Sequence, residues 1–239
     1  MKPTLAHAFW ELRLTLRNGE QLLLTLIIPL ALLIGICATG VLSSSDGLSR
    51  VEQAYPMVCM VSLIATCFTS LAIGTGFERR SGALTFLATT PLGRQGLVLG
   101  KVIATVMLAA ISIVLVTVTA VILGWRPSIA ALWALPILLI AGIAFATWAL
   151  VIASVFRAEA VLAIANALFL VLVVVGGASA RSSSNSAGVL VELVPSAALA
   201  DALRSSLGVG SAPCWPTLAI LAVWAIVGYA LARSRFRWQ

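Results

Sequence analysis

Long apolar runs dominate the chain, and short polar segments separate them. Six of these runs are long enough, and free enough of charge in their middle, to cross a bilayer as helices, at residues 22–42, 54–77, 97–123, 129–155, 160–179 and 213–232. Strands of a membrane barrel would instead be about ten residues long with alternating polarity. The pattern predicts an all-α polytopic membrane protein with six transmembrane helices, in a single domain over residues 1–239.

The composition supports a membrane environment. Hydrophobic residues make up 61% of the 239 residues, whereas charged residues make up only 10%. Soluble domains carry about 25% charged residues, so a water-soluble fold of this length could not bury so much apolar surface. The net charge of +7 is small for the length of the chain and does not indicate a nucleic-acid partner.

Lysine and arginine are distributed unevenly between the two predicted membrane sides. With the N-terminus in the cytoplasm, the other side receives only Arg50, Arg126, Arg181 and Arg204. The cytoplasmic side then holds Lys2, Arg13, Arg17, Arg79, Arg80, Arg94, Lys101, Arg157, Arg233, Arg235 and Arg237. Because basic residues favour the cytoplasmic side, this bias predicts that both termini are cytoplasmic.

Residues 1–20 precede the first predicted span and show a helical apolar stripe. The stripe consists of Leu5, Phe9, Leu12 and Leu16. Arg13 and Arg17 lie beside it, which is typical of an amphipathic interfacial helix with its arginines near lipid head groups. A plain cytoplasmic tail is the alternative.

The polar segment between the second and third predicted spans opens with charged residues and continues with an apolar patch. Glu78, Arg79 and Arg80 come first, and a glycine follows at Gly82. The helical patch consists of Ala83, Leu84 and Leu87, and Pro91 ends it. A short surface helix with exposed apolar residues can dock a soluble partner. A basic loop whose apolar residues rest on the bilayer is the alternative.

The segment at 180–212 connects the last two predicted spans. A serine-rich turn is followed by an amphipathic stretch, which predicts short re-entrant helices at the outer membrane interface. Pro195 suits the first turn of a helix that ends at Gly208.

Residues that could carry out catalysis are scarce. The single histidine, His7, lies in the N-terminal segment, and no Asp or Glu falls inside a predicted span. Hydrolytic, zinc or aspartyl chemistry therefore lacks its side chains, and we predict no catalytic or metal site. A carrier driven by protons or sodium usually shows ionisable residues within its spans. Energy for uphill transport would then come from a partner.

Residues 96–101 superficially resemble a phosphate-binding loop, which would give the chain its own nucleotide site. The glycine spacing is one residue short, and Val102 stands where Ser or Thr would reach magnesium. We therefore predict no nucleotide or other cofactor on this chain. Lys101, one turn into the third span, is expected to extend its ammonium group to the membrane interface.

Neutral polar and aromatic side chains are the candidates for a substrate path. Asn166 is the most polar residue in the middle of a span, and either an interhelical hydrogen bond or a substrate contact would explain it. Trp148 and Phe145 add aromatic surface, which suits an amphiphile, a lipid or a hydrophobic compound.

Three parts of the sequence together resemble the membrane subunits of type-2 ABC exporters, which include bacterial polysaccharide exporters and drug-resistance permeases. The polar segment is similar at Glu78, Arg79, Arg80, Gly82, Leu84, Thr90, Pro91, Leu92, Gly100 and Lys101. The start of the chain is similar at Arg13, Arg17 and Pro29, and the last connection at Pro195, Leu199, Asp201, Ala202, Leu203 and Arg204. Thr85 departs from the pattern, since relatives often carry Glu there.

The resemblance implies a permease of the bacterial cytoplasmic (inner) membrane that exports an amphiphilic or hydrophobic substrate. Its partners would be two cytoplasmic ABC ATPase subunits, which hold ATP and magnesium, and a second permease subunit, identical or related. Residues 78–91 would form the coupling helix, with Leu84 and Leu87 buried in the ATPase and Arg79 or Arg80 paired with its acidic residues.

Two further elements take roles from the same resemblance. The interfacial helix would flank the coupling helix, through Phe9, Leu12, Arg13 and Arg17. An external gate would be formed by Pro195, Leu199, Asp201 and Arg204. A secondary carrier or channel, or a membrane scaffold without transport activity, are the alternatives.

Overall fold

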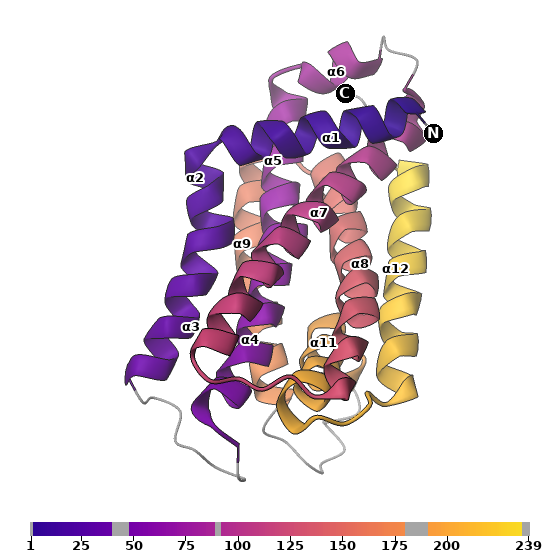
Figure 1. Ribbon diagram of the computed structural model, residues 1–239. Helices are drawn as coiled ribbons and strands as arrows, with labels where there is room; N and C mark the ends of the chain where they lie inside the picture. The colour runs from indigo at the N-terminus through magenta and orange to yellow at the C-terminus, as the bar shows by residue number, and fades with distance from the viewer. Residues whose placement is uncertain (1, 40–47, 89–91, 180–190, 236–239) are drawn as a thin grey trace.

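The computed structural model describes residues 2–39, 48–88, 92–179 and 191–235. Every regular element within these ranges is a helix, and they contain no strand. The long helices form an upright bundle, and α1 (Lys2–Arg17) lies across one end of it (Figure 1). The end that carries α1 and the short α6 (Ala83–Ala88) is called the α6 end, and the opposite end, where α11 (Pro195–Leu203) lies, the α11 end.

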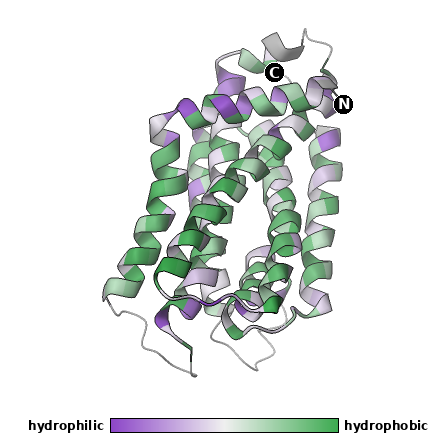
Figure 2. Cartoon of the chain, viewed as in Figure 1, coloured by the Kyte–Doolittle hydropathy of each residue, from purple (hydrophilic) through white to green (hydrophobic). Residues whose placement is uncertain are grey.

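Five helical stretches in the described residues are long and apolar enough to cross a membrane. They are Arg50–Arg80, Gly93–Ile122, Ile129–Val155, Ala158–Ala178 and Trp215–Ser234. A shorter apolar helix, Leu23–Thr39, occupies the place of the first predicted span, whose predicted end at residue 42 lies outside the described residues. Apolar residues cover the length of the bundle, whereas polar ones gather at its ends and in α1 (Figure 2). The chain is therefore an all-helical, multi-pass membrane protein; six crossings stay a prediction.

The first apolar helix and the second are each interrupted by π-helical turns. After α2 (Gly19–Leu22), η1 (Leu23–Ile27) leads into α3 (Ile28–Thr39). α4 (Arg50–Ile64), η2 (Ala65–Ser70) and α5 (Leu71–Arg80) form the second stretch. Ser49 and Glu52 cap α4 reciprocally, because each side chain bonds the backbone N–H of the other. This capping box explains why the helix begins earlier than the apolar run that predicted it.

α1 packs on α7 (Gly93–Ile122) through one narrow face. Ala8 and Leu12 are buried against Ala104 and Leu108 of α7. Of the apolar stripe, only Leu12 is buried in the protein, whereas Leu5, Phe9 and Leu16 are exposed on the outer side of α1. That α1 lies in the membrane interface stays a prediction.

Two glycines of α7 explain how closely α1 approaches it. A Cβ atom on Gly100 would lie 2.5 Å from Cδ2 of His7, and one on Gly96 would lie 3.3 Å from Oγ1 of Thr4. Neither position could carry a side chain without displacing α1 or its side chains. The glycines that superficially resembled a phosphate loop therefore serve helix packing.

The α11 end is closed by elements that fold back into the bundle. η3 (Ile129–Trp133) leads into α8 (Ala134–Val155), which α9 (Ala158–Ser179) follows. α11 packs against α4, α8, α9 and α12 (Trp215–Arg235). Pro195 opens α11, as predicted, and the π-helical η4 (Arg204–Val209) continues it to Val209, one residue beyond the predicted end. Gly210 then takes a left-handed conformation with φ of 76°.

Candidate functional site

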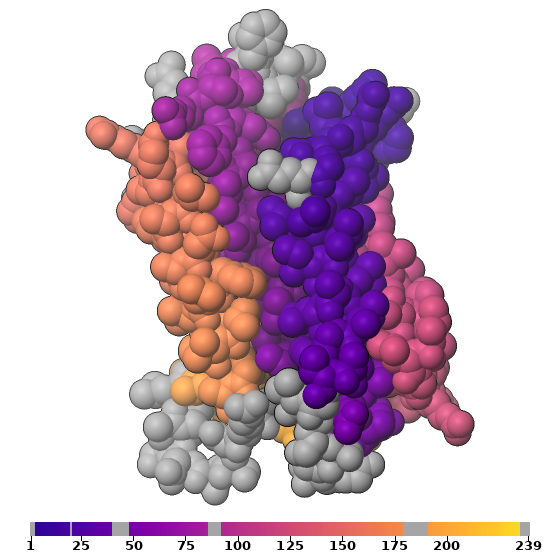
Figure 3. Space-filling view, turned by 90° about the vertical axis from the view of Figure 1, so that its left-hand side faces the viewer, coloured from indigo at the N-terminus to yellow at the C-terminus, as the bar shows by residue number. Residues whose placement is uncertain are grey.

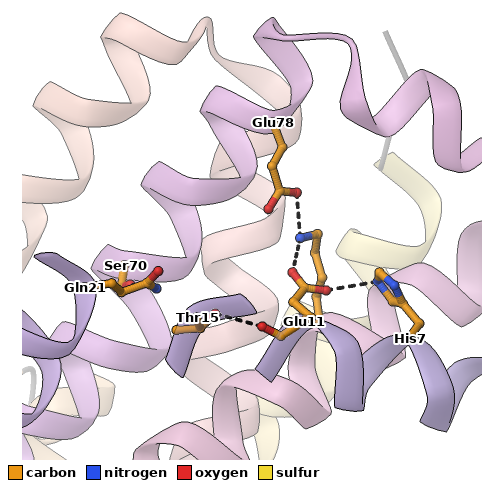
Figure 4. A network of polar contacts seen from close by, with 7 residues as sticks. His7, Glu11, Thr15, Gln21, Ser70 and Glu78 are labelled. Carbon is orange, nitrogen blue, oxygen red and sulfur yellow. Dashed lines mark hydrogen bonds and ion pairs between the residues drawn. The ribbon is translucent and has the colours of Figure 1, made fainter. Parts of the chain in front are cut away.

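A buried ionic cluster connects α1, α5 and α7 at the α6 end. Lys101 is only 1% exposed, and its Nζ lies 2.7 Å from Oε2 of Glu78 and pairs with Oε1 of Glu11 as well (Figure 4). A buried charge is destabilising unless partners surround it, and these two carboxylates supply them. The ammonium group of Lys101 is therefore buried within the protein, and its position relative to the membrane interface stays a prediction.

His7 completes the cluster from the preceding turn of α1. Its Nε2 lies 3.0 Å from Oε2 of Glu11, the carboxylate oxygen that does not face Lys101. Burial alone raises the pKa of the Glu11 carboxyl, but His7 and Lys101 outweigh it, and the net pKa is lowered from the ordinary 4.5. Glu11 is thus held as an anion.

A second polar contact joins α2 to η2. Nε2 of Gln21 donates a hydrogen bond of 2.8 Å to Oγ of Ser70 (Figure 4). Gln21 lies in α2 and Ser70 ends η2, so the start of the first apolar helix is bonded to the π-helical turn of the second.

The two arginines that follow Glu78 are both engaged within the chain. Nη1 and Nη2 of Arg79 donate hydrogen bonds to the carbonyl oxygens of Ser154 and Phe156, each at 2.6 Å. Arg80 forms an exposed ion pair with Glu159 at the start of α9. The base of α6 is therefore fixed to the turn between α8 and α9.

In α6, Leu84 faces the bundle. Gly82 has φ of 78°, which lets the chain reverse between α5 and α6. Leu84 is 0% exposed and packs in the core, so the prediction that it presents an apolar surface is wrong for this structure. Ala83 and Thr85 are exposed instead. The side chain of Leu87 and all of Pro91 lie outside the described residues.

The other predicted site residues are scattered. Pro195 and Leu199 are buried in α11, Asp201 is exposed on it, and Arg204 is partly buried in η4. Phe145 is in the core, and Nε1 of Trp148 donates to the carbonyl oxygen of Trp224 at 3.1 Å. Asn166 is exposed on α9. The three candidates for the substrate path therefore do not meet on one surface of this subunit.

A tryptophan that sequence reasoning overlooked fastens the α11 end. Nε1 of Trp125 donates a hydrogen bond of 2.9 Å to the carbonyl oxygen of Leu207 in η4. Its ring packs on Tyr55, with centroids 4.6 Å apart, and the hydroxyl of Tyr55 bonds Oγ1 of Thr117 at 2.7 Å. Trp125 directly follows Gly124 at the end of an apolar run, and tryptophan is enriched at membrane interfaces. This position was the only feature of the sequence that indicated a role for Trp125 at this end.

The bundle and its ionic cluster define a multi-pass membrane protein with polar attachments at one end, and no metal-binding group of His, Cys, Asp or Glu occurs in the described residues. The model of the family described as "ABC-2 type transporter" matches residues 6–207. This chain belongs to that family, whose membrane domains are permease components and generally non-catalytic. No curated protein matches the chain at a significant level.

Proposed function

We propose that this chain is the transmembrane permease subunit of an ABC exporter. It moves an amphiphilic or hydrophobic substrate out of the cytoplasm or the inner leaflet, using ATP hydrolysed by two separate cytoplasmic ATPase subunits. The match to the ABC-2 type transporter family carries this proposal. The resemblance to bacterial type-2 exporters supports a location in the bacterial inner membrane. The bias of basic residues toward the α6 end supports cytoplasmic positions for both termini.

The α6 end suits the attachment of a soluble motor. α6 stands outside the bundle as a short helix (Figure 1), with Ala83 and Thr85 exposed beside Gly82. Its base is held by ion pairs and hydrogen bonds through Glu78, Arg79 and Arg80. A helix that is exposed at its tip and rigid at its base can transmit a push from a bound partner.

A second permease subunit covers the face of α9 in this proposal. Asn166 is exposed in the middle of this apolar helix and makes no hydrogen bond to the residues that the structure describes. An amide that faced lipid would be destabilising, so a partner helix or a substrate path must satisfy it. Figure 3 shows this side of the subunit, where α9 and the α2–α3 region flank a hollow with α4–α5 at its floor.

The external gate is the remaining part of the proposed mechanism. α11 packs against four other helices, and its buried residues Pro195 and Leu199 can move only if those helices separate. Tilting of the helices after ATPase closure would release α11 and open the exit at this end.

Co-purification tests the proposal. The tagged chain, extracted in mild detergent, should retain an ABC ATPase encoded beside it in equal amounts. Inverted membrane vesicles that contain both proteins should accumulate a fluorescent amphiphile only when ATP is present. Vesicles with this chain alone that accumulate the dye without nucleotide would establish a secondary carrier. A chain that binds no ATPase and moves no dye would instead be a scaffold.

A further inference from the structure

Lys101 occupies an unusual position for a lysine in a membrane helix. It lies near the α6 end of α7, almost completely buried, and it contacts two carboxylates from two other elements. Glu11 comes from α1, and Glu78 comes from the last turn of α5, a few residues before α6. One ammonium group therefore joins the interfacial helix, the base of the proposed docking helix and the third apolar helix.

We propose that Lys101 is a positioning residue that makes α1, the base of α6 and α7 move as one body, so that force applied at α6 enters α7 through this residue. The inference rests on the proposed function, because it concerns how a motor bound at α6 acts on the membrane helices.

The electrostatics of the cluster favour rigid coupling. Two carboxylates face one ammonium group that is almost completely buried, while the side chain of Glu78 is 38% exposed. Separating either carboxylate therefore leaves the buried ammonium group with a single partner. Removing a partner from a buried ammonium group is more destabilising than breaking a fully solvated pair, because the buried charge is less well hydrated. When Glu78 moves, Lys101 is therefore expected to move with it, so that the ion pair is kept.

The packing around the cluster has the same effect. Gly100, adjacent to Lys101, lets His7 lie directly against the backbone of α7, and His7 in turn contacts Glu11. His7 and Gly100 leave no room for a larger side chain between α1 and α7 at this point, so α1 cannot slide here without displacing His7.

A reporter at the opposite end of the molecule can test the transmission without knowledge of the substrate. Cys214 is exposed between η4 and α12, whereas Cys59 and Cys67 are buried. With Cys37→Ser, an environment-sensitive maleimide dye on Cys214 would report on the α11 end. The sample is the full complex with its ATPase in lipid nanodiscs, and the signal is the change in dye emission when ATP and magnesium are added.

We expect the emission of the unmodified complex to change with ATP. In Lys101→Met, ATPase binding and ATP hydrolysis should persist, while the emission change per complex should fall about tenfold. Lys101→Arg, which keeps the charge, should retain most of the change.

A second variant disturbs the contact between α1 and α7 without altering a charge. Gly100→Ala should force His7 and α1 away from α7 and reduce the emission change as Lys101→Met does. Gly74→Ala is the matched control, because a Cβ atom there meets nothing within 4 Å. Adding His7→Ala to Gly100→Ala should restore space and recover the signal.

The outcomes separate this inference from the proposed function. If the unmodified chain binds no ATPase, the proposed function itself fails. If Lys101→Met and Gly100→Ala complexes bind ATPase and keep the full emission change, or if the unmodified complex hydrolyses ATP without any change at Cys214, the transmission role is overturned. A variant that is only less heat-stable, with an unchanged signal per complex, also overturns it. Should Lys101→Met fail to insert, the comparison of Gly100→Ala with Gly74→Ala decides.

Discussion

Arg79 donates a hydrogen bond of 2.6 Å to the carbonyl oxygen of Ser154, and so fastens the last turn of α5 to the last turn of α8. A second bond of equal length reaches the carbonyl oxygen of Phe156. Carbonyl groups at the end of a helix have no partner within it, and a cation there is doubly favourable because it also opposes the helix dipole. The structure therefore gives Arg79 a role within the chain.

Arg79→Met should lower the heat stability of the purified chain more than Arg80→Met does. The first change leaves two carbonyl groups short of donors and should cost about 1–3 kcal/mol. The second removes an exposed ion pair with Glu159, for which about 0–1 kcal/mol is expected. Thermal unfolding of both variants in the same detergent provides the comparison, and equal shifts would refute the assignment of Arg79.

Thr85→Arg should weaken ATPase binding, because Thr85 is exposed on α6 and a bulky cation there would obstruct a close-fitting groove. A loss of about tenfold or more in co-purified ATPase is expected for a central contact. Ser211→Arg introduces the same side chain at the α11 end and should bind ATPase normally. Normal binding by Thr85→Arg would show that the partner does not cover this face of α6.

Asn166→Cys should cross-link two copies of the chain if α9 meets a second permease subunit of the same kind. The background needs Cys37→Ser and Cys214→Ser, since the buried Cys59 and Cys67 will not react. Val118→Cys, on an exposed position of α7, serves as the control and should stay monomeric on denaturing gels. If neither variant cross-links with a bifunctional maleimide, a homodimer through α9 is excluded.

The contribution of Glu11 to the attachment of α1 to α7 should not change with pH between about 5 and 8. The folded pKa of Glu11 is lowered from 4.5, so its ion pair contributes fully above that ordinary value and is lost as pH falls through the lower folded value. Limited proteolysis of α1 as a function of pH measures this. Glu11→Gln should remove the acid-dependent step, and an unchanged step in that variant would assign it to another group.

The helical spans were predictable because apolar runs of sufficient length leave few alternatives in a protein this hydrophobic. The run at 129–155 coincides with a helical stretch of the same bounds. The start of the second span was placed late, because its first turns are polar and depend on the Ser49–Glu52 cap rather than on hydropathy.

The ionic cluster was not predictable in the same way. Lys101 and Glu11 are far apart in sequence, and neither lies in a motif that indicates pairing. Which face of α1 is buried depended on Gly96 and Gly100, whose role emerges only when another helix lies across them. Leu84 shows the same limit, since a helical apolar pattern does not reveal whether its partner is the same chain or another one.

The π-helical turn η2 has a consequence for everything that follows it in the second span. A π turn holds about one residue more than an α turn, so it rotates the rest of the helix by about 100° relative to an uninterrupted α-helix. This rotation orients Glu78 toward Lys101 and Arg79 toward Ser154. Shortening η2 by one residue would keep the composition of the span nearly intact and yet swing both side chains away from their partners.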